Sequence, residues 1–392
     1  MKWGFYLISL EQVQNNHKIT KVVRKEEKLM RVVIAAAGTA GHINPGLAIA
    51  NKIKKEERNS KIIFIGTTRG LENDLVPRAG YELKTIEAYG LSKKICTTLK
   101  ATGKARKIIQ EFKPDVIIGA GGYICGATIS AAHSLKIPTL LHESNSFPGR
   151  AIKMLAKKTD TILVSFQDAI PRIKRGKNVV FTGTPVKIRK QNYSEDKKMK
   201  ILQEVGLKGD KPIVLVFGGS QGAKKINDTL IEIIKEKQNS NYQVIWATGL
   251  KQYDIIKEEL ETSNTNINNI SNMKIVPYIY NMEELMNVVD VIVARSGAMT
   301  ITEISNLGKP SILVPLPNVS HNHQLYNAKA LEKVGAAKII LNYEINGQKL
   351  NQVIEEIIAD KKNLEKMGQN ALKISTTDAE DKIYKEIKKL VK

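Results

Sequence analysis

Short apolar runs alternate with amphipathic stretches along this chain from Met30 onward. The runs are rich in valine and isoleucine without polar alternation, which is typical of parallel strands covered on both faces. We predict strands at Arg31–Ala36, Lys61–Gly66, Asp115–Gly119, Pro138–His142, Thr161–Ser165, Val179–Thr182, Pro212–Phe217, Tyr242–Ala247, Met273–Val276, Asp290–Ala294, Ser311–Val314 and Ala337–Leu341. Helical patterns between them include Gly46–Glu57, Gly103–Phe112, Gly149–Lys158, Lys224–Lys235 and Met299–Asn306. This alternation predicts an α/β protein with doubly wound sheets.

The pattern restarts near the middle of the chain. The stretch Lys187–Lys200 is polar and charged and is interpreted as a linker, and a strand, a glycine-rich turn and a helix recur on either side of it. We therefore expect two Rossmann-like domains facing a central cleft, at residues 30–186 and 187–370. Residues 371–392 are expected to form a helix that packs back towards the first domain.

Residues 1–29 differ from the rest and are interpreted as an extension outside the fold. The run Arg24–Lys28 consists of residues that purine-only codons can encode, so it could be a translated ribosome-binding site. Our hypothesis is that Met30 is the natural start. Inspection of the coding DNA tests it, and a ribosome-binding site upstream of Met1 would count against it.

The composition is that of a globular protein: 392 residues, 42% hydrophobic and 26% charged. Two cysteines, Cys96 and Cys125, cannot form a disulfide framework, so a reducing compartment is expected. No apolar stretch approaches the roughly 20 residues of a spanning helix, and we expect a cytoplasmic protein. The net charge of +22 favours phosphates, lipid headgroups or nucleic acid as partners, but a lysine-rich solvated surface explains it equally well.

Glycine-rich turns follow four of the predicted strands. They are Gly38-Thr39-Ala40-Gly41-His42, Gly119-Ala120-Gly121-Gly122-Tyr123, Gly218-Gly219-Ser220-Gln221-Gly222 and Arg295-Ser296-Gly297-Ala298. Such turns place free helical N–H groups beyond the carboxyl ends of the strands, which suits phosphate. Their spacing fits neither a dinucleotide motif nor a Walker A loop, and no Asp-x-Asp is present. We expect a diphosphate held by helix N-termini and side-chain cations, with no metal and no cofactor.

Three polar residues near the carboxyl ends of predicted strands are candidates for chemistry, each with a structural alternative. His42 could act as a general base or could be a histidine hydrogen-bonded to backbone. Asn145 could bind a sugar or form an Asx-turn. Glu303 could accept from ribose hydroxyls or complement a helix dipole as a first-turn acid. His321-Asn322-His323 is a poor metal site because no further ligands accompany it.

The stretch Leu91–Lys107 carries basic residues and no acid. The basic residues are Lys93, Lys94, Lys100, Lys104, Arg106 and Lys107. Apolar residues interleave with them, so the stretch could rest on an anionic membrane surface. A solvated helix face is the alternative.

Several ordered motifs together resemble the MurG family. They are Gly38-Thr39-Ala40-Gly41-His42 with Pro45-Gly46, Gly121-Gly122-Tyr123, His142-Glu143-Ser144-Asn145, Gly183-Thr184-Pro185-Val186, Gly218-Gly219-Ser220-Gln221-Gly222-Ala223, Arg295 to Glu303, and Gln324-Leu325-Tyr326-Asn327-Ala328. The resemblance covers Met30 to about Lys392. Members of this family move N-acetylglucosamine from UDP onto lipid-linked muramyl-pentapeptide at the cytoplasmic face of the membrane. The resemblance implies a GT-B fold, with the acceptor and membrane on the first domain and UDP-N-acetylglucosamine on the second.

The resemblance also assigns roles to residues. It places Thr39, Ala40, Gly41 and Asn145 near the donor sugar or its junction with the acceptor, Ser220 on donor phosphate, and Ile279 on uracil through its backbone. It places Ala298, Met299, Thr300, Ile301, Thr302 and Glu303 on phosphate and ribose, with Glu303 on the ribose hydroxyls, and Gln324 on the sugar hydroxyls. Two departures stand out. Ala37 and Ala40 replace glycines of the family's first loop, and the family's arginine is replaced by Lys187, with Arg189 as the other candidate.

The resemblance thus implies an inverting, metal-independent transfer with His42 as the best candidate for the base. One alternative is another enzyme on this scaffold, such as a UDP-N-acetylglucosamine 2-epimerase or a glycolipid synthase. A more remote alternative is a non-catalytic basic protein that binds nucleic acid. The dispersed positive charge, an aromatic content of 5% and the lack of a nucleic-acid motif speak against it.

Overall fold

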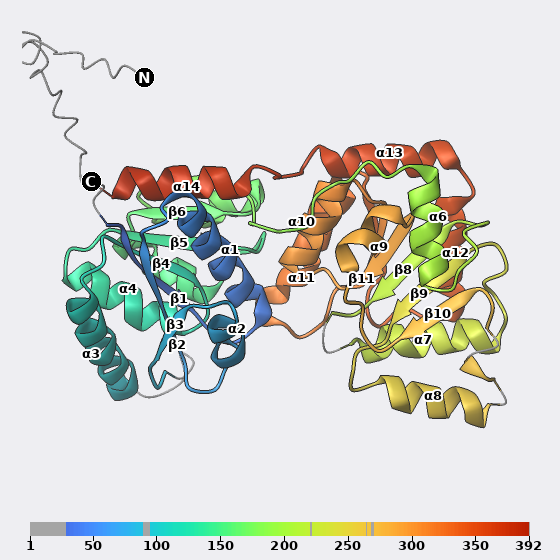
Figure 1. Cartoon of the computed structure of the whole chain (residues 1–392), viewed down its shortest axis with the longest axis horizontal. Coiled ribbons are helices and arrows are strands. Elements are labelled where there is room, and N and C mark those ends of the chain that lie inside the picture. Colours follow the sequence, from blue (N-terminus) through green and yellow to red (C-terminus); the bar gives the residue numbers. More distant parts are fainter. Residues whose placement is uncertain (1–28, 89–94, 220–221, 264, 268–269, 392) are drawn as a thin grey trace, which may run out of the picture.

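A computed structural model describes residues 29–88, 95–219, 222–263, 265–267 and 270–391 of the chain. The described strands form one seven-stranded and one six-stranded sheet. Every strand pairs in parallel with its neighbours. Figure 1 shows the two sheets in two domains that lie side by side, each with helices on its faces. This architecture is the two-domain, doubly wound α/β fold that the sequence predicts.

The first sheet has the strand order β3-β2-β1-β4-β5-β6-β7. Its strands are β1 (Arg31–Ala36), β2 (Lys61–Gly66), β3 (Glu82–Thr85), β4 (Val116–Gly121), β5 (Thr139–Glu143), β6 (Thr161–Val164) and β7 (Val179–Phe181). The second sheet has the order β10-β9-β8-β11-β12-β13. Its strands are β8 (Ile213–Phe217), β9 (Gln243–Ala247), β10 (Met273–Val276), β11 (Val291–Ala294), β12 (Ser311–Leu313) and β13 (Ala337–Ile339).

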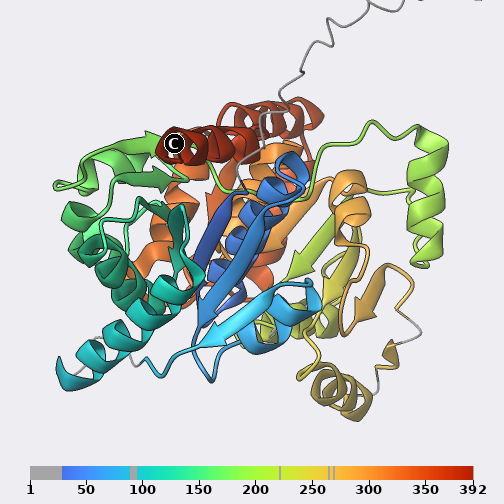
Figure 2. The ribbon, with the colours of Figure 1, turned by 60° about the vertical axis from the view of Figure 1, so that its left-hand side comes forward.

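Helices cover both faces of each sheet, as Figure 2 shows for the first domain. The helices of the first half are α1 (Ala40–Glu56), α2 (Glu72–Arg78), α3 (Ile95–Phe112), α4 (Ile124–Ser134) and α5 (Arg150–Leu155). Those of the second half are α6 (Glu195–Glu204), α7 (Lys224–Lys235), α8 (Tyr253–Thr262), α9 (Met282–Val288), α10 (Ala298–Leu307), α11 (His323–Lys333), α12 (Gly347–Ile358), α13 (Lys361–Leu372) and α14 (Ala379–Leu390). Both faces of the central strands are therefore buried, which is why these strands lack alternation.

Four local predictions were wrong, each for a physical reason. The helix α3 begins at Ile95 rather than Gly103, because a glycine is tolerated inside it. The strand β3 was missed because its sequence is polar and it lies at the exposed edge of the sheet. The first helix begins at Ala40 rather than Gly46, because Pro45 is tolerated inside it. The interval Lys187–Lys200 is not wholly a linker, because α6 begins within it, where the Ser194 side chain accepts from the N–H of Lys197.

The C-terminal helix α14 lies along the first domain, although the chain reaches it from α13 on the second domain (Figure 1). Its Ile383 and Ile387 belong to the hydrophobic core that surrounds β1. Tyr384 and Lys388 bind the Glu57 carboxylate just beyond α1, with oxygen–oxygen and nitrogen–oxygen distances of 2.7 and 2.6 Å. The two domains are thus connected by two crossings of the chain.

Candidate active site

The sheet topology brings the glycine-rich turns into two pairs. In the first sheet β1 and β4 are neighbours, so the turn at Gly38 lies beside the turn at Gly121. In the second sheet β8 and β11 are neighbours, so the turn at Gly218 lies beside that at Ser296. Both pairs occupy the points where strand order reverses, which is where open α/β sheets bind ligands.

His42 lies in the first turn of α1, against the turn that follows β4. A Cβ atom added to Gly121 would lie 2.3 Å from Cδ2 of His42, so the imidazole fills the space that this glycine leaves. Its Nδ1 lies 3.2 Å from the carbonyl oxygen of Ala37. Burial lowers the pKa of His42, with a further lowering by His323. The ring is therefore neutral at pH 7, and an Nδ1–H donated to Ala37 leaves Nε2 as an acceptor.

The N-terminus of α1 offers backbone donors beside this imidazole. Thr39 is its N-cap residue, and no side chain among the described residues caps the helix there. The first turn contains no acid, so the helix dipole favours an anion at this end. Thr39, Ala40 and Gly41 thus surround free N–H groups next to His42. Pro45 has no N–H for the carbonyl of Gly41, which is consequently left without its helical donor.

Asn145 directly follows β5, at the same carboxyl edge. The buried Glu143 carboxylate accepts from the backbone N–H of Asn145 at 2.8 Å, from its side-chain amide at 3.1 Å, and from the N–H of Gly149 at 2.7 Å. Burial raises the pKa of Glu143 despite these three bonds. The side chain of Asn145 is therefore held in one orientation. The Asx-turn alternative was wrong, because Oδ1 of Asn145 accepts from the side chain of Asn327 in the second domain at 3.2 Å, and not from a backbone N–H two residues on.

Asn327 connects the two domains at this edge. Its side chain, on α11, is fully buried. It donates to Oδ1 of Asn145 at 3.2 Å and to the carbonyl of Ser296 at 3.1 Å, and it accepts from the N–H of Ser146 at 2.9 Å. One amide thus joins the turn after β5 to the turn after β11. The carboxyl edges of the two sheets consequently face each other, and the predicted site residue Asn145 contacts the second domain through Asn327.

An aromatic cluster lies beside this bridge. The ring of Phe147 in the first domain stacks on Tyr326 and His321 of the second, with centroid distances of 4.9 and 5.5 Å. The guanidinium of Arg172 lies 5.1 Å from the Tyr326 ring centre and donates to the carbonyl of Ser146 at 2.5 Å. Stacking and cation–π contacts stabilise the seam between the domains.

The helix α10 begins on the second domain's side of this seam, directly after Gly297. Ile301 and Thr302 point into the core, and the Thr302 hydroxyl donates to the carbonyl of Ala298 at 2.9 Å. Their side chains therefore do not face a ligand, and the N–H of Ile301 already donates to the carbonyl of Gly297 at 3.0 Å. The free N–H groups at this end are those of Ala298, Met299 and Thr300. Glu303 lies in the second turn, so the prediction of a first-turn acid was wrong. Burial raises its pKa to about 7, and no described residue donates a hydrogen bond to its carboxylate.

The other predicted residues are distributed as follows. The Gln324 amide oxygen accepts from the N–H of Leu316 at 2.9 Å, which leaves its NH₂ group to donate. Ile279 is buried after β10. Arg189 lies 3.8 Å from Glu380 of α14, away from the Asn327 bridge, and Lys187 is exposed. Ser220 lies outside the described residues.

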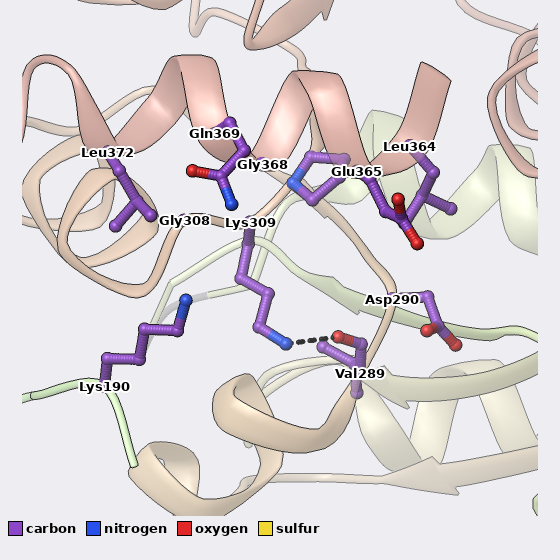
Figure 3. A pocket seen from close by; sticks show the side chains of 11 residues that line it. Lys190, Val289, Asp290, Gly308, Lys309, Leu364, Glu365, Gly368, Gln369 and Leu372 are labelled. Carbon is purple, nitrogen blue, oxygen red and sulfur yellow. Dashed lines mark hydrogen bonds between the residues drawn. The ribbon is translucent and has the colours of Figure 1, made fainter. Parts of the chain in front are cut away.

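A pocket of about 190 Å³ lies at the other edge of the second sheet, where β11 and β12 begin (Figure 3). Its buried Lys309 ammonium donates to the carbonyls of Asn287 and Val289, each at 2.7 Å. Burial lowers the pKa of Lys309 to about 8. None of the predicted site residues lines this pocket, so it is separate from the facing edges.

Four residues of the facing edges were given no site role by the sequence analysis. Glu72 and Phe147 were not singled out, His323 was weighed only as a metal ligand, and Asn327 was quoted only as part of a motif. Asn327 lies three residues after Gln324, one turn along α11, so helical spacing could have indicated it. Glu72 and Phe147 carried no such signal, because tertiary contacts alone bring them to the site. Among the described residues no group of three or more metal-ligating side chains occurs. No described helix is long and apolar enough to cross a membrane.

Two Rossmann-like domains whose glycine-rich turns face each other form the GT-B fold, which is that of many glycosyltransferases. Two family models agree with this: the glycosyltransferase family 28 N-terminal domain matches residues 32–164, and its C-terminal domain matches residues 213–384. The chain belongs to glycosyltransferase family 28, and within it to the MurG family.

Similar proteins cover nearly all of this chain. A relative from Acetivibrio thermocellus is 44% identical over 93% of this chain and 99% of its own length. One from Thermoanaerobacter sp. strain X514 is 42% identical over 92% of this chain and 100% of its own length. Both are named UDP-N-acetylglucosamine--N-acetylmuramyl-(pentapeptide) pyrophosphoryl-undecaprenol N-acetylglucosamine transferase.

Solved structures share the fold. Acinetobacter baumannii MurG is 26% identical, with a TM-score of 0.75 over 92% of this chain and 99% of that chain. A UDP-N-acetylglucosamine 2-epimerase from Listeria monocytogenes is 12% identical, with a TM-score of 0.67 over 92% of this chain and 96% of that chain, and shares the fold alone.

Proposed function

We propose that this enzyme transfers N-acetylglucosamine from UDP-N-acetylglucosamine to the muramyl 4-hydroxyl of undecaprenyl-diphospho-muramoylpentapeptide, in peptidoglycan synthesis. The observation that carries this proposal is the agreement of relatives at 42–44% identity over at least 92% of the chain on that activity. The facing carboxyl edges support it, because a donor and an acceptor must meet between the two domains.

The donor binds the second domain in this proposal. Its diphosphate lies at the N-terminus of α10, where Ala298, Met299 and Thr300 offer backbone N–H groups. The ribose hydroxyls donate to the Glu303 carboxylate, which has no hydrogen-bond donor among the described residues. Gln324 donates to a sugar hydroxyl, and the backbone of Ile279 contacts uracil. Ser220 on donor phosphate, and Lys187 or Arg189 in the role of the family's arginine, remain predictions.

His42 is the base in the proposed reaction. The acceptor hydroxyl attacks the anomeric carbon from the face opposite UDP, and its proton passes to Nε2 of His42 as the new bond forms. The bond between the anomeric carbon and the diphosphate oxygen breaks, and its electron pair leaves with UDP. The neutral state of His42 and its bond to Ala37 support this assignment. The helix dipole of α10 stabilises the charge that develops on the departing UDP.

The outer side of the first domain is the proposed membrane contact. Exposed Leu99 and Lys100 lie on α3, on the side of this domain away from the second (Figure 1). Lys104 and Lys107 are also exposed, whereas Ala101 and other small apolar residues face α4.

Anionic vesicles should bind the full chain at low salt and release it at high salt. Replacement of Lys100, Lys104 and Lys107 by glutamine should weaken that binding. The first eight residues of the stretch, 91–98, have side chains outside the described set.

One assay tests the proposal. The full chain is incubated with labelled UDP-N-acetylglucosamine and a short-chain lipid-linked muramyl-pentapeptide, and the lipid product is separated. We expect label in a β-linked disaccharide, at a rate that EDTA leaves unchanged. Donor alone provides the discriminating arm, since a 2-epimerase would convert it without acceptor. Label that never reaches the lipid would refute the proposal, and strong inhibition by EDTA would refute the metal-free mechanism.

A further inference from the structure

Glu72 is a fully buried carboxylate at the start of α2. Its Oε1 accepts from the backbone N–H of Thr67 at 2.8 Å and from the Thr67 hydroxyl at 2.6 Å. Its Oε2 accepts from the N–H of Gly38 at 2.9 Å. Three donors therefore converge on one side chain that no sequence motif singles out.

Two neighbouring glycines leave the space that the Glu72 side chain fills. A Cβ atom on Gly70 would lie 1.9 Å from its Oε2, and one on Gly66 would lie 2.7 Å from its Cγ. Burial by itself would raise the pKa of Glu72, but the hydrogen bonds from Thr67 and Gly38 outweigh it and hold the pKa below the usual value. Glu72 is thus ionised at neutral pH, with its charge balanced by dipoles.

The contact with Gly38 connects Glu72 to the loop that carries the base. Gly38 has a φ of +95°, a conformation that L side chains rarely adopt. Its N–H donates to Glu72, and its carbonyl accepts from the N–H of Leu71 at 3.4 Å. The N–H and the carbonyl of Gly38 are consequently both held by residues at the beginning of α2. Four residues later in the chain comes His42.

Charged groups reach His42 from two other elements. Glu72, from α2, stabilises the protonated imidazole, and His323, from α11, destabilises it. Glu72 therefore favours the protonated imidazole that forms during transfer, because the imidazole gains a proton as the acceptor hydroxyl loses one. A buried carboxylate also keeps its charge from being screened by water.

We propose that Glu72 is a positioning residue for the transfer: it fixes the Gly38 turn that precedes His42, and its negative charge acts on the imidazole. The inference rests on the proposed function, since it concerns the same reaction. In this proposal Glu72 acts by holding the Gly38 turn and by the electrostatic effect of its charge on His42, and it does not contact the substrates.

Two variants separate the charge from the geometry. Glu72→Gln removes the charge and turns an NH₂ group towards a backbone donor. Thr67→Val keeps the charge and removes one hydroxyl donor. Asp160→Asn is the matched control, because Asp160 accepts from the N–H and hydroxyl of Thr139, each at 3.0 Å, at the opposite edge of the same sheet. The full chain is used throughout, and thermal unfolding checks that each variant is folded.

The readouts are kcat, the donor KM and the pKa of His42 from NMR of histidine-labelled protein, with His42→Gln to assign the signal. For Glu72→Gln we expect a fall in kcat of about 10–100-fold, a donor KM within about 3-fold, and a lower pKa of His42. For Thr67→Val we expect a smaller fall in kcat and an unchanged pKa of His42. Asp160→Asn should match the wild type in all three.

An unchanged pKa of His42 in folded Glu72→Gln would overturn the inference, whatever happens to kcat. An equal loss of kcat in Asp160→Asn would overturn it as well, because the effect would then be one of general stability. If the wild type transfers no label, the proposed function fails. The NMR titration would still decide whether Glu72 acts on His42.

Discussion

Gly121 offers the sharpest test of how the imidazole of His42 is placed. Its φ is +133°, and a Cβ atom there would lie 2.3 Å from Cδ2 and 2.7 Å from Cγ of the ring. In Gly121→Ala the new methyl group therefore meets the ring itself, and the backbone conformation is strained whatever space is made.

The magnitude follows from these two effects. Ordinary contact begins near 3.4 Å, so the ring must retreat by roughly 1 Å. A displacement of that size at a reacting group costs about 100-fold in rate. The strained φ adds a loss of stability of about 1–3 kcal/mol. Donor affinity should stay the same, because the donor-binding turns lie in the second domain.

The assay compares kcat, donor Kd and the midpoint of thermal unfolding for the wild type, Gly121→Ala and Gly126→Ala. Gly126 is the matched control, since it lies five residues further on in α4 and a Cβ atom there meets no atom within 4 Å. In the helix, its replacement by alanine should stabilise by about 0.5–1 kcal/mol and leave kcat unchanged. A folded Gly121→Ala with wild-type kcat would refute the reasoning, because the position of the ring would then not matter for the reaction.

Three further outcomes are expected. His42→Ala should depress kcat strongly with little change in donor KM, and unchanged turnover would remove His42 from the role of base. Asn327→Ala should lower stability by about 2–4 kcal/mol and increase hydrogen exchange at residues 144–147, because it leaves buried partners in both domains unpaired; Asn370→Ala, which lies within the second domain, should leave that exchange unchanged. The affinity for UDP should fall up to about tenfold per pH unit as the pH drops below about 7, because the raised pKa of Glu303 means that its carboxylate must lose a proton before ribose can donate to it. Glu303→Gln should remove this pH dependence, and calorimetry between pH 5.5 and 8.5 checks it; a wild-type affinity that is flat across this range would contradict the role of Glu303.

Most of the strands could be predicted from the sequence, because burial on both faces imposes long apolar runs. Arg31–Ala36, Lys61–Gly66 and Met273–Val276 match the observed strands residue for residue. The exception was β3, whose polar edge position imposes no such pattern. The helix boundaries were less accurate, because Pro45 is usually found at a helix start and here lies inside α1.

Sequence by itself determined the class of the fold, the two domains' glycine-rich turns and His42 as a candidate, since glycine, proline and apolar periodicity act locally. Tertiary structure alone decided that the turns pair at the reversals of strand order, that Asn327 joins the domains, and that Glu72 holds the Gly38 turn. Glu72 lies 34 residues from Gly38, and Asn327 lies 182 from Asn145. Contacts over such separations depend on how the strands are ordered in the sheets and how the two domains meet, and no local pattern of residues records either.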